Sequence, residues 1–337
     1  MGEAAKVNVT KFAYFKAARA TRAIRDAEDS DEARDELRKY NRWQSTEYNS
    51  AVARSRSAKQ WQRFEDNKDV LPNLKWLPSR SVNRREEHIQ FYNRVWAKDD
   101  PFWSKNQPGN VYGCKCDWVE TNEPVTDGNA KGKTKSSTPG LDVNPGIQGE
   151  LFSMDHPYIA EAKGDEALIR DIAKNEVTYD GVRISVMADA KEMRDNITTG
   201  RVLAKGGEDV LIRRDFNPNT VGGFDKSHNP EYEINGVKAD AKRVESDKGV
   251  SGAFKKAIEQ ECRIVIIDLD KNNVPLKGIA NRISNRSADF LKTKALDECW
   301  VVKNGKYVKF KVEDFERHTD RKQRVLAFEE KLKKALQ

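Results

Sequence analysis

The chain runs from Gly2 to Pro72 without a proline or glycine between them. A helix interior tolerates these two residues least, so a stretch without them favours long helices. Over residues 10–66, alanine, isoleucine and aromatic side chains recur at helical spacing. Ser30 and Asp31 are suited to cap a second helix within this stretch. We therefore expect a long helix or a pair of helices at the start of the chain.

The 337 residues exceed the usual size of one hydrophobic core, so two domains are expected. Residues 121–140 are rich in glycine, lysine, serine and threonine, and Val125 is their only large aliphatic side chain. This composition is typical of a linker or mobile loop. The sequence thus predicts a helical module over 1–120, a linker and module tail over 121–164, and an α+β domain over 165–337. It has no apolar run of about 18 residues that would predict a membrane span.

Residues 165–337 mix strand and helix patterns. Short strand-like segments flank the turn dipeptides Asp180-Gly181, Asn235-Gly236 and Asn304-Gly305, which predicts three β-hairpins. The segments DEALIRDIAK, GAFKKAIEQEC and SADFLKTKAL have helical patterns, and RIVIIDLD reads as a buried strand. Together they predict an α+β fold around an antiparallel sheet.

The charge balance bears on the class of partner. The net charge of +7 and the pI near 9.0 favour contact with polyanions through phosphate groups. The alternative is that this charge only keeps the chain soluble. The four cysteines do not form the framework of a secreted disulfide protein, so a reducing compartment is expected.

The second predicted hairpin gathers charged residues. A two-residue turn at Asn235-Gly236 places Glu231 opposite Asp240. Lys242 shares a strand face with Asp240, because strand side chains alternate. His228 sits at the start of the opposite arm. These four side chains are therefore expected at one end of the hairpin, unless the hairpin is only a solvated face with cross-strand ion pairs.

Two nuclease mechanisms fit this cluster. Without a metal or other cofactor, His228 takes a proton from a ribose 2′-OH and Lys242 stabilises the phosphorane. With a metal, Glu231 and Asp240 hold Mg²⁺ and Lys242 positions water, in a pattern that resembles the PD-(D/E)xK nuclease core. Further candidates are Arg282, Arg286 and Thr293 for the substrate phosphate, and Glu166 or Glu176 as an upstream glutamate of the metal site.

A cysteine pair lies near the end of the first module. His88, Cys114 and Cys116, with a fourth ligand such as Asp117, form a candidate zinc set. The usual C-x-x-C spacing is absent and no second pair exists, so the spacing favours a tight loop over a zinc site. Such a loop would be held by the packing of Trp103, Tyr112 and Trp118.

Three segments of the first module carry a family resemblance. They are YNRWQSTEYNSAVARSRSAKQWQRFED, LPNLKWLPSRSVNRREEH and DPFWSKNQPGNVYGCKCDW. With their YN-x-W-x-x-TEY-x-x-A, R-x-x-H, D-x-FW and C-x-C motifs in order, residues 10–160 resemble the phage Mu protein F-like minor head proteins, also called head morphogenesis proteins. The chain departs from the family in having C-K-C for C-R-C and Gln107-Pro108 for a double proline. The resemblance implies portal and capsid proteins as partners, and a location in the virion head or, during assembly or after delivery, in the host cytoplasm.

A second resemblance covers the hairpin and the segment after it. HNPEYEINGVKADAKRVES followed by GAFKKAIEQECRIVIIDLD resembles the ribonuclease toxins of contact-dependent inhibition systems, within the barnase/EndoU/colicin/RelE-like nucleases. It implies a C-terminal ribonuclease toxin that acts on RNA, such as tRNA, and an immunity protein as partner. The alternatives are a metal-dependent DNase and a purely structural head protein whose C-terminal domain has no catalytic role.

Overall fold

The computed structural model describes residues 2–129, 137–162, 164–215, 229–270 and 274–336. The chain divides into two compact units, Met1–Ile172 and Ala173–Gln337. The first is mainly helical and the second combines a sheet with helices, so the expected multi-domain class is confirmed. Among the described residues, no helix is both long and apolar enough to span a membrane.

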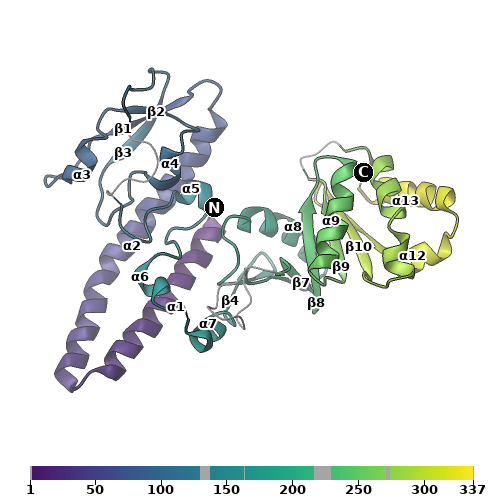
Figure 1. Ribbon diagram of the computed structural model, residues 1–337, viewed down its shortest axis with the longest axis horizontal. Coiled ribbons are helices and arrows are strands. Elements are labelled where there is room, and N and C mark those ends of the chain that lie inside the picture. The colour runs from purple at the N-terminus through teal and green to yellow at the C-terminus, as the bar shows by residue number, and fades with distance from the viewer. Residues whose placement is uncertain (1, 130–136, 163, 216–228, 271–273, 337) are drawn as a thin grey trace. The chain divides into compact units, whose positions relative to one another are not determined.

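The first unit begins with the expected pair of helices. Helix α1 covers Gly2–Asp26 and helix α2 covers Ser30–Asp66, and they lie side by side (Figure 1). The cap of α2 is Asp29, one residue earlier than expected, and its carboxylate accepts hydrogen bonds from the amides of Asp31 and Glu32. This side chain satisfies two of the amides that a helix start leaves unpaired.

A three-stranded antiparallel sheet follows α2. Strand β1 (Asn73–Leu77) lies between β2 (Val95–Ala97) and β3 (Asp117–Thr121). The short helices α3 (Glu86–Ile89) and α4 (Phe102–Lys105) lie in its connections. Buried aromatic side chains join the sheet to the end of α2; they are Trp61, Phe64, Trp76, Phe91, Trp96, Phe102, Trp103 and Trp118. The sequence patterns did not predict this sheet.

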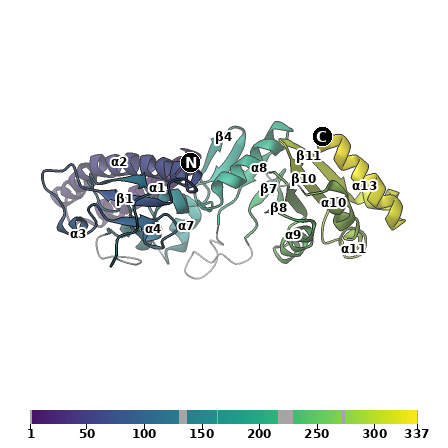
Figure 2. The same cartoon turned by 90° about the horizontal axis from the view of Figure 1, so that it is seen from above.

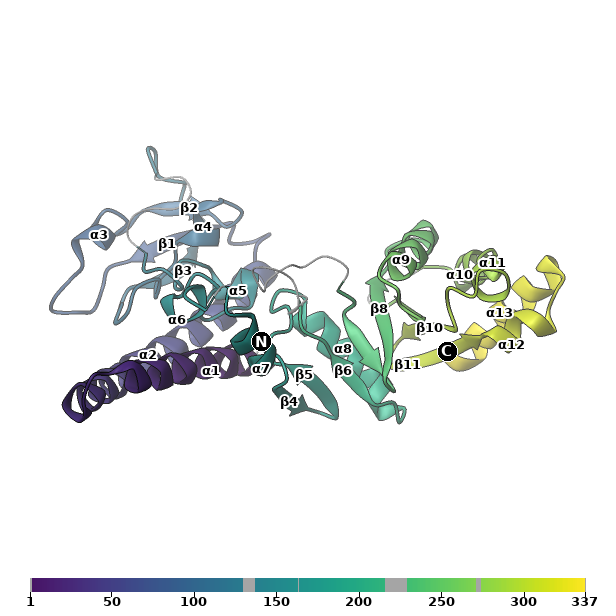
Figure 3. The same ribbon diagram turned by 60° about the horizontal axis from the view of Figure 1, so that its bottom comes forward.

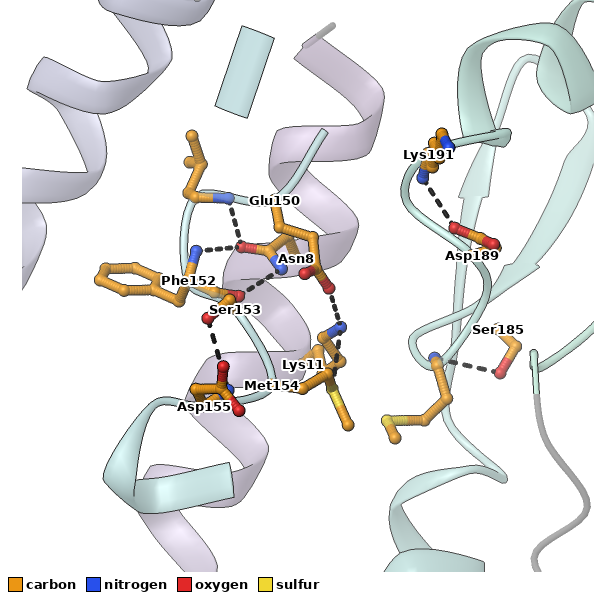
Figure 4. A network of polar contacts seen from close by, with 12 residues as sticks. Asn8, Lys11, Glu150, Phe152, Ser153, Met154, Asp155, Ser185, Asp189 and Lys191 are labelled. Atoms are coloured by element: carbon orange, nitrogen blue, oxygen red, sulfur yellow. Dashed lines mark hydrogen bonds and ion pairs between the residues drawn. The ribbon is translucent and has the colours of Figure 1, made fainter. Parts of the chain in front are cut away.

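The tail of the first unit returns to the helical pair. It holds α5 (Pro145–Gln148), α6 (Pro157–Ala160) and α7 (Glu166–Ile172), and α7 packs against α1 although its residues fall in the expected C-terminal domain. Asn8 on α1 fixes the segment before α6 (Figure 4). Its side chain accepts from the amides of Leu151 and Phe152, both at 2.9 Å, and donates to the Phe152 carbonyl at 3.0 Å.

Arg54 on α2 is fully buried and binds four backbone carbonyls. Its guanidinium donates at 2.6–3.2 Å to the carbonyls of Leu151, Gly109, Leu141 and Val143. Burial lowers the pKa of Arg54 to about 9, which still leaves it charged at neutral pH. One side chain thus fixes three loop segments to the same helix.

We expect Arg54→Met to lower the free energy of unfolding of the first unit by about 3 kcal/mol or more, because four buried carbonyls lose the hydrogen bond from Arg54 and Val143 keeps only its bond from Gln107. Urea unfolding followed by tryptophan fluorescence measures this, since every tryptophan except Trp300 lies in the first unit. Arg56→Met is the matched control, because Arg56 is exposed on the same helix. An equal loss of unfolding free energy in both variants would contradict the stabilising role that we assign to Arg54.

The second unit is built on one eight-stranded sheet in the order β11-β10-β9-β8-β7-β6-β5-β4. The strands are β4 (Glu176–Tyr179), β5 (Val182–Ser185), β6 (Val210–Ile212), β7 (Tyr232–Ile234), β8 (Val237–Arg243), β9 (Ile264–Asp268), β10 (Glu298–Lys303) and β11 (Lys306–Lys311). The three predicted hairpins, β4–β5, β7–β8 and β10–β11, are confirmed. Both residues of each turn have positive φ, as a type I′ turn requires.

The sheet is mixed, although we expected it to be antiparallel. The pairs β5–β6, β8–β9 and β9–β10 are parallel. Parallel neighbours need a crossover. Three crossovers contain helices: α8 (Met193–Lys205), α9 (Asp247–Glu259), and α10 (Leu276–Ser284) with α11 (Ser287–Leu291). The hairpins could be predicted because their turns are encoded by neighbouring residues. The parallel pairings were missed because they depend on contacts between segments far apart in the sequence.

The core of this unit lies between the sheet and its C-terminal helices. All five residues of β9 are buried. Helix α9 packs on β8 and β9, and α9 and α10 lie along one side of the strands (Figure 3). Helix α12 (Val312–Arg317) leads to α13 (Arg321–Leu336), which lies beside α10 and β11 (Figure 2). This packing buries Phe254, Phe290, Phe310, Phe315 and Phe328.

Candidate functional site

Strand β8 is longer than its partner β7. The first residue of β7, Tyr232, pairs with Ala239, but β8 continues to Arg243 along β9. Glu231 precedes Tyr232 and so comes beside Asp240, as the hairpin register predicted. The second half of β8, from Asp240 to Arg243, therefore extends beyond the start of β7 and pairs only with β9.

The two carboxylates occupy an environment of low polarity. Asp240 is 1% exposed, and the Glu231 side chain is 16% exposed. Burial, with a contribution from the charge of Asp240, raises the pKa of Glu231 to about 8. Burial raises the pKa of Asp240 to about 6. Neither carboxylate oxygen of Asp240 has a hydrogen-bond partner among the described residues.

Two lysines face this pair. The ammonium of Lys256 on α9 lies 3.6 Å from Glu231 Oε1 and 3.9 Å from Asp240 Oδ1. Lys242 is exposed and lies two residues after Asp240 on the same strand face. The positive charges of Lys256 and Lys242 both lower the pKa of Asp240, against the larger effect of burial. The sequence singled out Lys242 but not Lys256.

A third carboxylate comes from the start of α8. Glu192 is the N-cap residue of this helix, and its charge raises the pKa of both Glu231 and Asp240. We had expected this role for Glu166 or Glu176. Glu166 lies in the first unit beside Arg170, and Glu176 pairs with Arg183 at 3.0 Å. Nothing in the sequence around Glu192 marks it as a partner of the hairpin.

A partly exposed ion-pair network fixes α8 against β8. Arg243 contacts Asp195 on α8 at 2.6 Å and Asp268 on β9 at 3.0 Å. Thr199 on α8 donates to the same Asp268 carboxylate at 2.8 Å. These contacts hold the first turn of α8, and with it Glu192, close to the end of β8.

The oxygen atoms of this cluster suit a hard divalent cation. Mg²⁺ is bound in proteins by one or two carboxylates together with waters and substrate phosphates. Glu231 and Asp240 supply such a pair, and no hydrogen bond from a described residue to the Asp240 oxygens would have to be displaced. The residues present therefore fit the expected Mg²⁺ set, with Glu192 as an added carboxylate.

The other expected site residues are placed as follows. His228 lies outside the described residues. Arg282 pairs with Asp247 at 3.0 Å, and Arg286 pairs with Asp289 at 2.6 Å. The Thr293 hydroxyl donates to two backbone carbonyls of α11. None of these contacts includes the carboxylate pair, and the role of these residues in binding phosphate stays a prediction.

The three candidate zinc ligands of the first unit converge. The Sγ atoms of Cys114 and Cys116 both lie 3.6 Å from His88 Nδ1. Hydrogen bonding to Cys116 lowers the pKa of the Cys114 thiol to about 4 despite burial. The expected fourth ligand, Asp117, instead pairs with Arg80 at 2.5 Å.

Comparison with known proteins adds little to this geometry. No protein-family model matches the chain, and no curated protein matches it. Part of the chain is similar to a CdiA-CT/CdiI toxin and immunity complex from Burkholderia pseudomallei, with 18% identity and a TM-score of 0.27. The match covers 36% of this chain and 85% of the other. Similarity at this level supports no argument about activity.

The raised pKa values predict how stability changes with pH. In the unfolded chain these carboxyls titrate near 4, so the folded unit binds their protons more tightly. Their contribution to stability is present below about pH 4 and is lost as pH rises through about 6 and 8, the pKa values of Asp240 and Glu231. In EDTA at pH 8.5, we expect Glu231→Gln to raise the melting temperature of the second unit by a few degrees.

Scanning calorimetry between pH 5 and 8.5 measures this difference. The variant should show a flatter dependence of melting temperature on pH than the unmodified chain. Glu245→Gln is the control, because Glu245 is exposed and lies on the segment that follows β8. A Glu231→Gln profile parallel to that of the unmodified chain would contradict the prediction.

Proposed function

We propose that the second unit is a metal-dependent nuclease that hydrolyses phosphodiester bonds in RNA. The observation that supports it is the buried pair of Glu231 and Asp240, with two lysines beside it. In the described part of the chain, the Asp240 carboxylate oxygens have no hydrogen-bond partner. Two like charges in a buried site are costly, and such perturbed groups cluster at functional sites. The basic net charge of +7 suits a polyanionic substrate.

In this mechanism Glu231 and Asp240 hold Mg²⁺, and Lys256 stabilises their ionised forms. The bound ion would polarise the phosphate and lower the pKa of a water molecule. Hydrolysis joins the water oxygen to phosphorus, breaks the bond to the leaving oxygen, and transfers a proton to that oxygen. Lys242, which is exposed beside Asp240, is placed to neutralise the charge that develops on the phosphate.

A metal-independent ribonuclease is the competing mechanism. Glu231, with a pKa near 8, is protonated at neutral pH and is suited to act as a general acid. The base proposed from the sequence, His228, is outside the described residues. The described residues therefore supply the general acid of this mechanism, and its base stays a prediction.

The test is to incubate the full chain with tRNA, other RNA and duplex DNA, each with Mg²⁺ or with EDTA. We expect cleavage of RNA that EDTA abolishes. Asp240→Asn and Lys242→Ala should each lower the rate by about 100-fold or more. Cleavage of RNA that persists in EDTA would favour the metal-independent mechanism, and cleavage of duplex DNA alone would favour the DNase alternative.

Lys255→Ala is the charge-matched control for the lysine variants. Lys255 neighbours Lys256 on α9 but is exposed and pairs with Glu259. The Lys255→Ala variant should cleave RNA at the rate of the unmodified chain, while the Lys256→Ala variant should lose this activity. Binding of RNA without cutting in any condition would favour the structural, non-enzymatic alternative.

We also propose that the first unit is a minor head module of the Mu F-like kind. Support comes from its four motifs, which the structure places on α2, at α3, at α4 and in the loop before β3. Portal and capsid proteins, a location in the virion head or host cytoplasm, and an immunity protein for the second unit are parts of the same proposal. Copurification of the chain with phage heads would test the location.

A further inference from the structure

The loop before β3 brings two thiols and an imidazole to one point. Gly113 has φ +71°, a left-handed conformation that L side chains rarely adopt, and the amide of Cys114 closes a turn onto the Val111 carbonyl at 3.3 Å. This bend lets Cys114 and Cys116 face the same atom of His88. The Nδ1 and the two Sγ atoms lie within 4.8 Å of one another.

The separations match those around a tetrahedral zinc ion. Zinc binds thiolate sulfur at about 2.3 Å and imidazole nitrogen at about 2.0–2.1 Å, so tetrahedral angles place sulfur and nitrogen about 3.6 Å apart. Both observed distances from sulfur to Nδ1 are 3.6 Å. The fit holds for each cysteine separately.

Ordinary hydrogen bonding accounts for only part of this arrangement. The Nδ1 atom of a neutral imidazole has one lone pair and accepts from one donor along one direction. Two sulfur atoms at equal distance from the same nitrogen, on side chains two residues apart, are better explained by a common cation among the three atoms. Mixed nitrogen and sulfur ligands select zinc over hard cations such as Mg²⁺.

The surroundings are those of a metal site with one open position. His88 is 1% exposed and its ring packs edge-on against Trp76, with centroids 5.5 Å apart. The three side chains also line a cavity of about 380 Å³. Its other lining residues are polar or charged and include Ser79, Ser81, Asn83, Arg84, Arg85 and Lys115. Three protein ligands with a fourth position open to solvent is a known form of zinc coordination.

We propose that His88 Nδ1, Cys114 Sγ and Cys116 Sγ bind one zinc ion, with water from the cavity as the fourth ligand. The ion fixes α3 and the loop before β3 to the small sheet of the first unit. The ion adds to contacts that already hold this loop, which include hydrogen bonds from Arg54 to the Gly109 carbonyl and from Arg85 to the Tyr112 carbonyl. Small folds commonly use a metal for that purpose. Two cysteines in C-x-C spacing can bind the same ion here, because the turn at Gly113 bends the backbone between Val111 and Cys114.

The test begins with the full chain, purified in reducing buffer, dialysed with zinc and then freed of excess metal. We expect about one zinc per chain by elemental analysis, and a loss of most of it in His88→Ala, Cys114→Ser and Cys116→Ser. Cys262→Ala is the control, because Cys262 is a buried free cysteine in the second unit, and it should retain zinc. Asp240→Asn should also retain it, which separates this site from the proposed nuclease site.

A second measurement uses the unmodified chain, so that it does not depend on the folding of a variant. Replacement of zinc by Co²⁺ should give the absorption of thiolate-to-cobalt charge transfer, and chelation should lower the melting temperature of the first unit by several degrees. A reduced chain that binds neither ion would overturn the proposal. So would zinc that remains in both Cys114→Ser and Cys116→Ser, or cysteines that form a disulfide in air and bind no metal when reduced again.

Discussion

The guanidinium of Arg54 has no contact with solvent, yet each of its nitrogens donates to a backbone carbonyl. The loops that contain Gly109, Leu141, Val143 and Leu151 present these carbonyls to α2, which supplies a donor for all four, and Gln107 donates a second hydrogen bond to Val143. A buried charge is tolerated when hydrogen bonds satisfy it fully. The same rule applies to Asp240 in the second unit, which is equally buried but whose carboxylate oxygens have no hydrogen-bond partner within the part of the chain that the structure describes. Buried polar atoms that the fold leaves unsatisfied need another explanation, and a cation or substrate is the simplest.

The topology of the second unit explains why the unsatisfied group lies where it does. The hairpin β7–β8 pairs only as far as Tyr232, while the parallel pairing with β9 carries β8 on to Arg243. The crossover through α9 brings Lys256 over that extension, and the crossover through α8 brings Glu192 to its end. A hairpin alone would have left Glu231 and Asp240 in solvent with ordinary pKa values. The two crossovers bury them and add the other charges.

The parts of this arrangement that follow from local chemistry could be predicted from the sequence. The Asn235-Gly236 turn sets the register that places Glu231 opposite Asp240, and the structure shows this pairing. Lys256 and Glu192 could not be predicted, because their positions depend on parallel pairings between strands that are far apart in sequence.

The small sheet of the first unit was missed for a different reason. Its strands are short, and their tryptophans belong to a single aromatic core rather than to an alternating pattern. The convergence of the two cysteines on His88 could not be predicted either, because the positive φ of Gly113 is not visible in a C-x-C motif.

The two proposed metal sites differ in the chemistry of their ligands, and this difference makes them separable. Oxygen ligands at Glu231 and Asp240 favour Mg²⁺, whereas His88, Cys114 and Cys116 favour zinc. EDTA removes both ions, so a loss of nuclease activity in EDTA does not by itself identify the metal that acts. Adding back Mg²⁺ alone refills only the carboxylate site. Recovery of cleavage under that condition would assign the chemistry to the second unit.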